Sequence, residues 1–350
     1  MMNPQERLEA FLAGQRPDRI PYTIYWNEWR HTADDPAWGP LFEKGLRVTY
    51  QVCTAAEKTK NVQYRQDCYE ENGKKLTRHT MQTPAGDVYA ISEHGWMQKY
   101  WITTADDYRV MKYIAENTEL TPNYEAFEIK AKEVASHGIA HTMLCSRSPI
   151  QTILVDYLGL ENFGLHLVSF EQEMMELYEA LLKNFRRKVE IVAAGPGKYV
   201  GVLENFTAET MGPKRFAKYH IPVYEELYPI LHSAGKIVGN HYDGKLSACK
   251  ELIAKAPIDL IESLTAPPEG DMTLAECRAA WPDKLLWVNI NVSDYQLEPK
   301  KLRQVVLDAV QPAAPDGRHL AFEISEAYPE NWKQSVPVVL DALEETRFIC

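Results

Sequence analysis

The stretch KIVGNHYDGKLSACKELIAKAPIDLIES (236–263) contains the pattern that decides the fold. A first apolar run, KIVGNH, is followed by a helical segment, SACKELIAKA, and then by a second apolar run, IDLIES. Both apolar runs are nearly continuous, which is typical of strands that are covered on both faces of a parallel sheet. The stretch therefore predicts a strand–helix–strand unit whose two strands are parallel.

The same alternation continues on both sides of this stretch. Further candidate strands are RIPYTIYW (19–26), HTMLCS (141–146), YVGVLEN (199–205), LLWVNIN (285–291) and HLAFEIS (319–325). With the two strands above, the chain has seven candidate strands of parallel character, and it has no GxGxxG turn that would indicate an open doubly wound sheet. We therefore expect an α/β fold, a (β/α)8 TIM-type barrel with one irregular strand.

Residues 60–103 interrupt this alternation. Polar and apolar residues alternate there, and turn signals occur at Asn72-Gly73 and at Pro84-Ala85-Gly86. Such a pattern predicts antiparallel hairpins that are inserted near the start of the barrel. No linker or low-complexity tract divides the chain, so we expect one domain over residues 1–350 with an inserted hairpin region at about 60–103.

Composition and charge exclude several classes of protein. The net charge of the 350-residue chain is −11, whereas nucleic-acid binding requires basic surface. No stretch reaches the roughly 20 apolar residues of a membrane span. The N-terminus resembles a helix that is capped by Asn3 rather than a signal peptide, so we expect a cytoplasmic protein. The six cysteines form no CxxC pair, and we expect them to be reduced thiols.

Polar residues follow several of the candidate strands, where a barrel carries its functional groups. They are Glu204, His241, Asp243, Glu262, Asn289, Asn291, Glu323, Glu326, Cys145 and Arg147. A single glutamate at a strand end is more often a helix cap or an ion-pair partner than a functional group. Several carboxylates and an imidazole in one barrel mouth, however, indicate a divalent cation, because the carboxylates would otherwise repel one another. We expect zinc or another divalent metal at Glu204, His241, Glu262 and Glu323.

Aromatic residues gather around the end of the first candidate strand. Tyr25, Trp26 and Trp29 could wall a pocket for a flat apolar ligand, although aromatic side chains also pack in cores. We count these three, together with Cys145, Arg147 and Asn289, as candidate substrate-binding residues. The candidate catalytic residues are His241, Tyr242, Asp243 and Glu262.

Six segments resemble, in order, the uroporphyrinogen decarboxylase superfamily and its corrinoid-dependent methyltransferase branch, especially the O-demethylase members. They are NPQERLEAFLAGQRPDRIPY (3–22), TPAGDVY (83–89), TTADDYRVMKYI (103–114), HYDG (241–244), IESLTAPPEGDMTL (261–274) and SEAYPENW (325–332). The likeness spans essentially the whole chain. Barrels of this superfamily often form dimers, so the resemblance also implies a homodimer.

Two departures from the family bear on activity. The decarboxylases have an arginine-rich loop, Met-Arg-Gln-Ala-Gly-Arg, after the first strand, whereas this chain reads IYWNEWR (24–30). Thiol-directed methyltransferases have a zinc site of His-x-Cys and a later Cys. Here His241 is followed by Asp243 at the first cysteine position, and Glu323 or Glu326 stands near the second. Hard oxygen ligands thus replace soft sulfur ligands, which suits the cleavage of a C–O bond.

The resemblance implies a methyltransferase that moves the methyl group of a methoxylated aromatic compound to the cobalt of a separate corrinoid protein. A metal could polarise the leaving oxygen, or Tyr242 or Glu262 could protonate it. One alternative is a decarboxylase of a small acid, which would need a cationic clamp from Arg30, Arg147 or Arg318. Another alternative is a non-catalytic binding module whose strand-end acids are structural.

Overall fold

The computed structural model of the chain describes residues 2–325 and 328–346. Contacts divide the chain into two compact units, and each is described by itself. The first unit comprises Met1–Thr54, Asn123–Leu144 and Val192–Cys350, and the second comprises Ala55–Pro122 and Cys145–Ile191. The expectation of one domain over residues 1–350 stays a prediction.

The first unit is built on a closed barrel of eight parallel strands. They are β1 (Tyr22–Tyr25), β2 (Leu46–Cys53), β9 (Gly138–Met143), β10 (Tyr199–Val202), β11 (Ile237–His241), β12 (Leu260–Thr265), β13 (Leu285–Asn289) and β14 (Leu320–Ile324). Their order around the barrel is β1-β14-β13-β12-β11-β10-β9-β2, and β1 pairs with β2 to close it. The predicted (β/α)8 barrel is therefore confirmed. The strand that sequence analysis missed is β2, where Arg47, Thr49 and Gln51 interrupt the apolar run.

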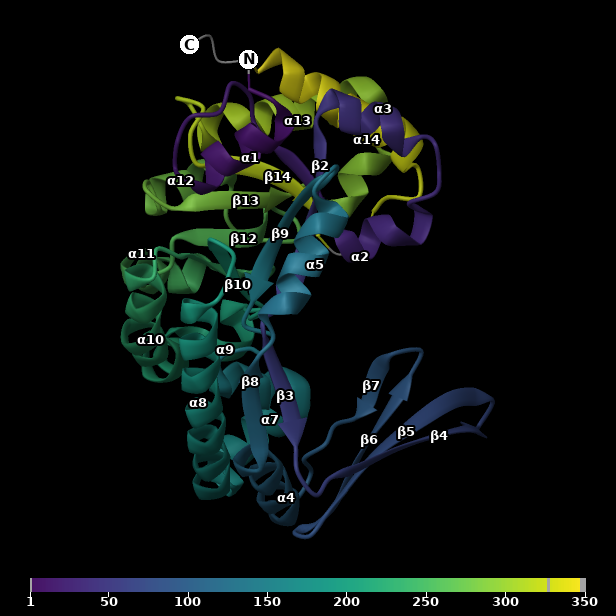
Figure 1. Cartoon of the computed structure of the whole chain (residues 1–350), viewed down its shortest axis with the longest axis vertical. Coiled ribbons are helices and arrows are strands. Elements are labelled where there is room, and N and C mark those ends of the chain that lie inside the picture. Colours follow the sequence, from purple (N-terminus) through teal and green to yellow (C-terminus); the bar gives the residue numbers. More distant parts are fainter. Residues whose placement is uncertain (1, 326–327, 347–350) are drawn as a thin grey trace. The chain divides into compact units, whose positions relative to one another are not determined.

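Helices connect the strands and cover the outside of the barrel (Figure 1). They are α1 (Pro4–Leu12), α2 (Trp26–Trp29), α3 (Trp38–Lys44), α5 (Tyr124–Val134), α9 (Ala208–Arg215), α10 (Ile221–Ser233), α11 (Lys250–Lys255), α12 (Leu274–Ala280), α13 (Pro299–Ala313) and α14 (Trp332–Glu345). Short 3₁₀ or π segments complete them: η1 (Arg30–Thr32), η3 (Phe216–His220), η4 (Ser247–Cys249) and η5 (Val292–Gln296). The predicted cap of α1 is present, because Asn3 Oδ1 accepts the Glu6 backbone N–H at 2.9 Å.

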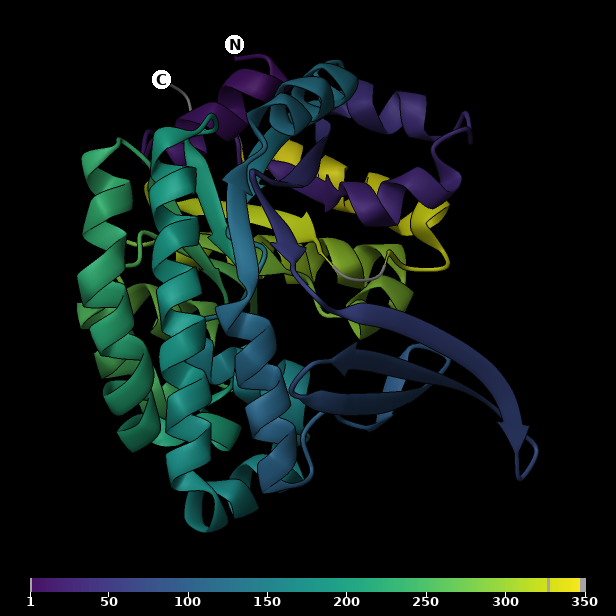
Figure 2. The same cartoon turned by 60° about the horizontal axis from the view of Figure 1, so that its bottom comes forward.

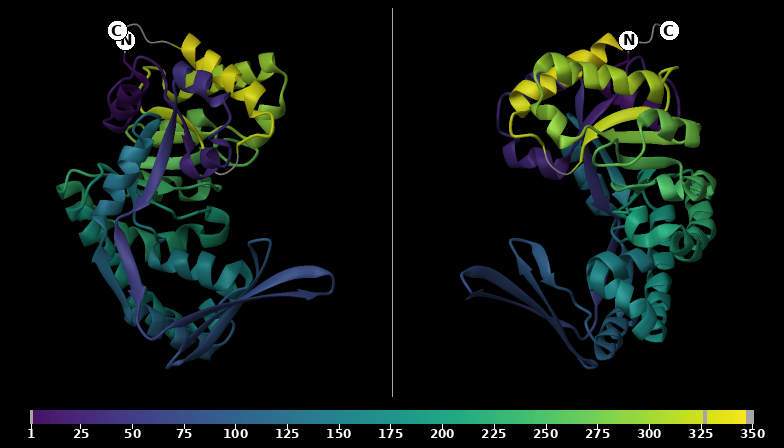
Figure 3. Two further views of the ribbon diagram at one scale, coloured as in Figure 1. Left: turned by 45° about the vertical axis from the view of Figure 1, so that its right-hand side comes forward. Right: turned by 180° about the vertical axis from the view of Figure 1, so that it is seen from behind.

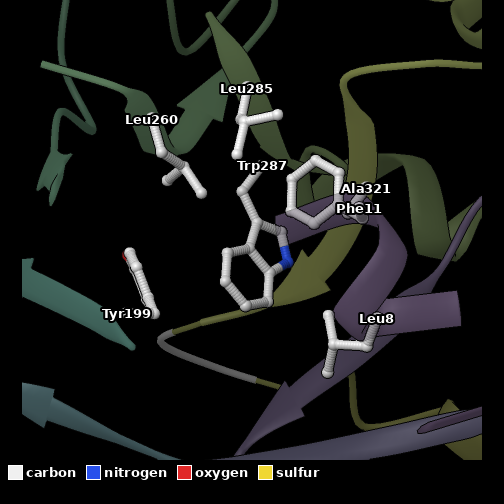
Figure 4. Packing of buried hydrophobic residues seen from close by; sticks show 7 residues of the cluster. All are labelled: Leu8, Phe11, Tyr199, Leu260, Leu285, Trp287 and Ala321. Carbon is white, nitrogen blue, oxygen red and sulfur yellow. The ribbon is translucent and has the colours of Figure 1, made fainter. Parts of the chain in front are cut away.

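A hydrophobic cluster fills the barrel interior near the N-terminal ends of the strands, which we call the lower part of the barrel (Figure 4). Its members are Leu8, Phe11, Tyr199, Leu260, Leu285, Trp287 and Ala321. Leu8 and Phe11 come from α1, and the Phe11 ring meets the edge of the Trp287 ring with 5.6 Å between centroids. The strand members mark which alternate side chains point inward, because successive residues of a strand face opposite sides.

The second unit contains the predicted antiparallel hairpins and several helices (Figure 2). Strands β4 (Gln63–Glu71), β5 (Lys74–Thr83), β6 (Gly86–Glu93) and β7 (Trp96–Lys99) form one antiparallel sheet, and β3 (Ala55–Thr59) pairs with β8 (Thr118–Pro122). Its helices are α4 (Ala105–Glu116), α6 (Pro149–Thr152), the π segment η2 (Ile153–Leu158), α7 (Gly159–Ser169) and most of α8 (Glu171–Ala194). Asn72 and Gly73 have φ angles of 52° and 75°, as the first predicted turn requires.

Two expectations from composition have different outcomes. Cys68, Cys249 and Cys277 are free thiols, as expected, but Cys53 and Cys145 are disulfide-bonded, so the expectation of reduced cysteines is wrong for these two. Among the described residues, no helix has the length and apolar character needed to cross a membrane.

We predict that Gly239→Ala lowers the free energy of unfolding by about 1–3 kcal/mol, as overpacking does. A Cβ at Gly239 would lie 2.7 Å from both Cε2 and Oη of Tyr199, so the ring would have to shift. Urea unfolding measures the change. The control is Gly39→Ala in α3, where a Cβ meets no atom within 4 Å; it should be neutral or stabilising by up to about 1 kcal/mol. Equal effects of the two substitutions would contradict this packing.

Candidate functional site

A layer of polar side chains lies two residues further along the strands than the hydrophobic cluster, toward the C-terminal ends of the strands. His241 follows Gly239 by two residues in β11, and Glu262, Asn289 and Glu323 follow the cluster residues Leu260, Trp287 and Ala321 by the same interval. Because side chains alternate along a strand, these four residues share the inner face of the barrel with the cluster. Strands β11 to β14 are consecutive neighbours, which Figure 3 shows from two further sides.

His241 lies between two carboxylates. Its Nδ1 is 3.0 Å from Oε2 of Glu262, and its Nε2 is 3.6 Å from Oδ2 of Asp243. The side chains of His241 and Glu262 are only 1% and 3% exposed, whereas that of Asp243 is 29% exposed. The pairing of β11 with β12 creates this contact, since His241 and Glu262 are direct partners in the register. The three residues therefore form a line that runs from the buried wall toward the surface of the mouth.

Asp243 has a pKa below its usual range. Burial acts to raise the pKa of this carboxyl, but the hydrogen bond and charge of His241 outweigh it, together with a hydrogen bond from Asn205. The Asn205 Nδ2 donates to Asp243 Oδ2 at 2.8 Å. Asp243 is consequently a carboxylate at neutral pH and can accept a proton or a hydrogen bond from a ligand.

A second polar group lies beside this line. Glu323 Oε1 accepts the backbone N–H of Ser263 at 2.9 Å, and the Asn289 Nδ2 donates to Oγ of both Ser263 and Ser325 at 2.7 Å. Ser263 has a φ of 60°, in the left-handed region that a side chain rarely adopts. Ser263 and Ser325 are not among the residues predicted from the sequence, although both are polar residues at the ends of apolar strands.

A cavity of about 170 Å³ opens next to these groups. Its lining includes the carboxylates of Asp243, Glu269 and Glu323, the amide of Asn289 and the ring of Tyr295. Oδ1 of Asn289 has no hydrogen-bond partner among the described residues and is free to accept one from a ligand. The described lining contains no lysine, arginine or histidine, so the cavity is polar and acidic.

Glu204 and Tyr242 belong to a different layer. Glu204 is fully buried and accepts the Tyr224 hydroxyl at 2.7 Å, and Tyr224 lies on α10 outside the strands. The Tyr242 hydroxyl donates to that of Tyr224 at 3.2 Å and accepts from the Asn240 amide at 3.1 Å. Asn240 and Tyr242 alternate with Gly239 and His241, so they face α10 rather than the barrel interior. Burial, followed by the charge of Glu204, raises the pKa of Tyr242 far above its usual range, which makes the phenol a weak acid.

The residues predicted to bind a metal are thus brought together only in part. His241 contacts Glu262, Glu323 hydrogen-bonds to the residue after Glu262, and Glu204 hydrogen-bonds in the outer layer. Over residues 2–325 and 328–346, no three His, Cys, Asp or Glu side chains are arranged so that they could hold a metal ion. Glu326, the other candidate, lies outside the described residues.

The predicted aromatic wall packs elsewhere in the first unit. Trp26 stacks on Tyr50 with ring centroids 4.4 Å apart, and Trp29 contacts the rings of Phe42 and His137. Tyr25 is buried, and its hydroxyl has no hydrogen-bond partner within the described part of the chain. None of the three predicted aromatic residues lines the 170 Å³ cavity. Their role in substrate binding stays a prediction.

Two other candidate substrate-binding residues belong to the second unit. Cys145 is disulfide-bonded, so it is not a free thiol. Arg147 pairs with Asp156, with 3.2 Å between Nη1 and Oδ1. Of the six residues predicted to bind substrate, Asn289 is therefore the one that lines the cavity, and the roles of Cys145 and Arg147 stay predictions.

Comparison with solved structures shows the fold. A methyltransferase from Methanosarcina mazei is 11% identical to this chain with a TM-score of 0.59, and the match covers 99% of each chain. A GH5_18 from Bifidobacterium longum subsp. infantis is 12% identical with a TM-score of 0.41, over 95% of this chain and 80% of that one. No protein-family model and no curated protein matches the chain.

We predict that Asn205→Ala lowers the free energy of unfolding by about 1 kcal/mol at pH 7, because Asp243 loses a hydrogen-bond donor. The folded-state pKa of Asp243 is depressed, so the contribution is present above the unfolded pKa of about 3.9 and is lost as the pH falls through the folded value. Urea unfolding at pH 7 and at progressively lower pH should show the difference from the parent protein shrinking.

Asn331→Ala provides the matched control for this pH dependence. Asn331 donates through Nδ2 to the backbone carbonyl of Tyr295 at 2.7 Å, and that acceptor does not titrate. Its destabilisation should therefore not change over the same pH range. An Asn205→Ala difference that is equally constant would contradict the assignment of Asn205 to the Asp243 carboxylate.

Proposed function

We propose that this chain is a methyltransferase that takes the methyl group of a methoxylated aromatic compound, a phenyl methyl ether, and transfers it to the cobalt of a corrinoid protein. The observation that carries the proposal is the buried His241, held between Glu262 and Asp243 beside a polar cavity at the C-terminal end of the barrel. The resemblance of the sequence to O-demethylases and the barrel shared with a methyltransferase add support.

The leaving oxygen is the difficult part of this reaction. Reduced cobalt supplies the electron pair that forms the new bond to the methyl carbon, and the electron pair of the broken C–O bond stays on the phenolic oxygen. That oxygen then needs a proton, because a phenolate is a poor leaving group. His241 can hold this proton, since Glu262 orients the imidazole through Nδ1. Asp243 can pass it into the cavity from the side of Nε2.

Other groups of the cavity would orient the substrate. Oδ1 of Asn289 could accept a hydrogen bond from a ring hydroxyl, which favours a methoxyphenol over a simple anisole. The Tyr295 ring could lie against the ring of the substrate, and the volume of about 170 Å³ restricts the ligand to a single ring. Fixing the methyl group toward the open mouth would contribute most to the rate, because the reacting atoms are then already aligned.

The metal site predicted from the sequence stays a proposal, and no step of this mechanism uses it. Zinc or another divalent ion at Glu204, His241, Glu262 and Glu323 has no support from the described geometry, since Glu204 hydrogen-bonds to Tyr224 in the outer layer. The proton route through His241 and Asp243 requires no metal ion. The corrinoid protein, a homodimer and a cytoplasmic location likewise stay proposals from the sequence.

The two other functions considered from the sequence gain less support. A decarboxylase would need a cationic clamp, yet the cavity lining contains carboxylates and no described basic residue. Arg318 is exposed beside Asp316, and Arg30 is an exposed residue of η1. A non-catalytic module would have no use for a buried imidazole aligned between two acids.

A second methyl donor is favoured by the charge of the cavity. Asp243, Glu269 and Glu323 would attract a cation, so a methylated ammonium compound is a candidate donor as well. Its leaving group is a neutral amine, which requires no proton. The two donor classes therefore predict different roles for His241.

We predict that the protein demethylates 2-methoxyphenol with cob(I)alamin as the acceptor, and that His241→Gln lowers kcat/KM by about 100-fold or more, as loss of a general acid does. The loss of cob(I)alamin absorbance and chromatography of the phenolic product measure the rate. Anisole, 2-methoxybenzoate and tetramethylammonium complete the panel, and carbon dioxide release is measured in parallel.

His232→Gln is the matched control for this substitution. His232 also pairs with a carboxylate, with 2.9 Å between Nε2 and Oδ2 of Asp259, but it lies on α10 at the protein surface. Its kcat/KM should equal that of the parent protein. Transfer from tetramethylammonium that survives His241→Gln would favour the cationic donor. An absence of methyl transfer from every compound would contradict the proposal, and carbon dioxide release would replace it with decarboxylation.

A further inference from the structure

A second cavity lies at the opposite end of the barrel. This lower cavity measures about 320 Å³ and is lined by the first residues of three neighbouring strands and by the end of α1. Ile139 and His141 come from β9, Tyr199 from β10 and Ile237 from β11, and Leu12 and Ala13 come from α1 and its cap. No described residue lines both this cavity and the 170 Å³ cavity at Asp243. Its volume is at the small end of the range of ligand sites, about 300–1,000 Å³.

One buried side chain of the lower cavity, His141, carries polar atoms without hydrogen-bond partners among the described residues. His141 is 2% exposed, and neither of its ring nitrogens has a hydrogen-bond partner within the described part of the chain. The hydroxyl of Tyr199 reaches toward Gly239 in the middle of β11, so Tyr199 contributes its ring to the lower cavity. The two rings are 4.7 Å apart at an angle of 58°. Buried polar atoms are nearly always hydrogen-bonded, so this buried imidazole on the wall of a cavity indicates a polar occupant.

The chemistry of His141 restricts that occupant. Burial lowers the pKa of His141 to about 3, so the imidazole is neutral at physiological pH. A neutral imidazole offers one N–H donor and one nitrogen acceptor, and it carries no net charge. A neutral hydroxyl group matches it, because a hydroxyl can both donate and accept.

The remaining walls are apolar. Leu12, Ile139 and Ile237 pack against the hydrophobic cluster of Figure 4, and the Tyr199 ring is itself a member of that cluster. In the described lining, charged side chains are present only at the exposed positions Glu9 and Lys198, which carry opposite signs. A flat apolar ring would therefore bury its surface here while its hydroxyl reaches His141.

We propose that the lower cavity is a second binding site, which takes a small neutral phenol whose hydroxyl hydrogen-bonds to His141. The site is independent of the proposed methyl transfer, because it lies at the opposite ends of the strands and uses other residues. A water cluster is the competing occupant, and it would leave the apolar walls without a ligand.

The test is titration of phenol into the full chain by isothermal titration calorimetry. We expect saturable binding with a Kd on the order of 1 mM, as befits a ligand of few atoms. His141→Phe keeps an aromatic ring but removes both nitrogens and should raise Kd about tenfold or more. Ala13→Phe fills part of the lower cavity from the end of α1 without altering His141, and it should raise Kd as well. Toluene has the ring but no hydroxyl, and it should bind at least about tenfold more weakly than phenol.

Two further variants make the result decisive. His220→Phe is the matched control, because His220 is likewise fully buried with both ring nitrogens unpartnered among the described residues, yet it does not line the lower cavity. Its affinity for phenol should equal that of the parent protein. Asn289→Leu tests the other cavity, and phenol that binds there would be weakened by this substitution alone. Circular dichroism verifies that each variant folds. If His141→Phe does not fold, the phenol affinity of Ala13→Phe tests the lower cavity in its place.

The proposal would be overturned by the absence of saturable phenol binding, by equal affinities for phenol and toluene, or by a loss confined to Asn289→Leu. Any of these results would leave the lower cavity as a water-filled space. None of them bears on methyl transfer, which is measured with cob(I)alamin in a separate assay.

Discussion

The register between β11 and β12 is the constraint on which the rest of the site depends. It sets His241 directly beside Glu262, so that a hydrogen bond of 3.0 Å forms inside the barrel. A slip of one residue would turn the Glu262 carboxylate toward the helices and leave a buried imidazole without its acidic partner. The closed ring of strands prevents such a slip, because every strand is hydrogen-bonded on both sides.

The layers of the barrel interior follow from the same alternation. Gly201 and Gly239 leave room inside β10 and β11, which the Met143 side chain fills at Gly201 and the Tyr199 ring fills at Gly239. Above this level the inward positions change from apolar side chains to His241, Glu262, Asn289 and Glu323. Below it the cluster around Trp287 joins the barrel to α1, and His141 faces a cavity at the lower end. Because every second side chain of each strand points inward, the barrel interior contains a polar mouth, a packed centre and a second cavity in succession.

The outer face of β11 has a separate role. Asn240 and Tyr242 form a hydrogen-bonded group with Tyr224, Tyr228 and Glu204, which joins the strand to α10. These buried bonds hold β11 against its helix and thereby fix the position of His241 on the opposite face. Glu204 therefore contributes to the wall that supports the site. The carboxylate that reaches the cavity from the loop after β11 is that of Asp243 instead.

The sequence by itself determined the barrel, the hairpins and the strand ends that carry His241, Glu262, Asn289 and Glu323, because apolar runs, turn residues and the period of two are local properties. It could not reveal that β2 completes the barrel, because Arg47, Thr49 and Gln51 interrupt the apolar run by which the other strands were recognised. Nor could it show that Glu204 lies in a different layer from His241, or that the side chains of Ser263 and Ser325 are in contact. Only the tertiary structure decided these points. The irregular residues after β10 and the left-handed backbone of Ser263 change the directions of the side chains, and a pattern of alternating residues cannot predict such changes. Partners such as Tyr224 and Asp243 likewise meet their neighbours through packing between elements, which depends on the closed fold as a whole.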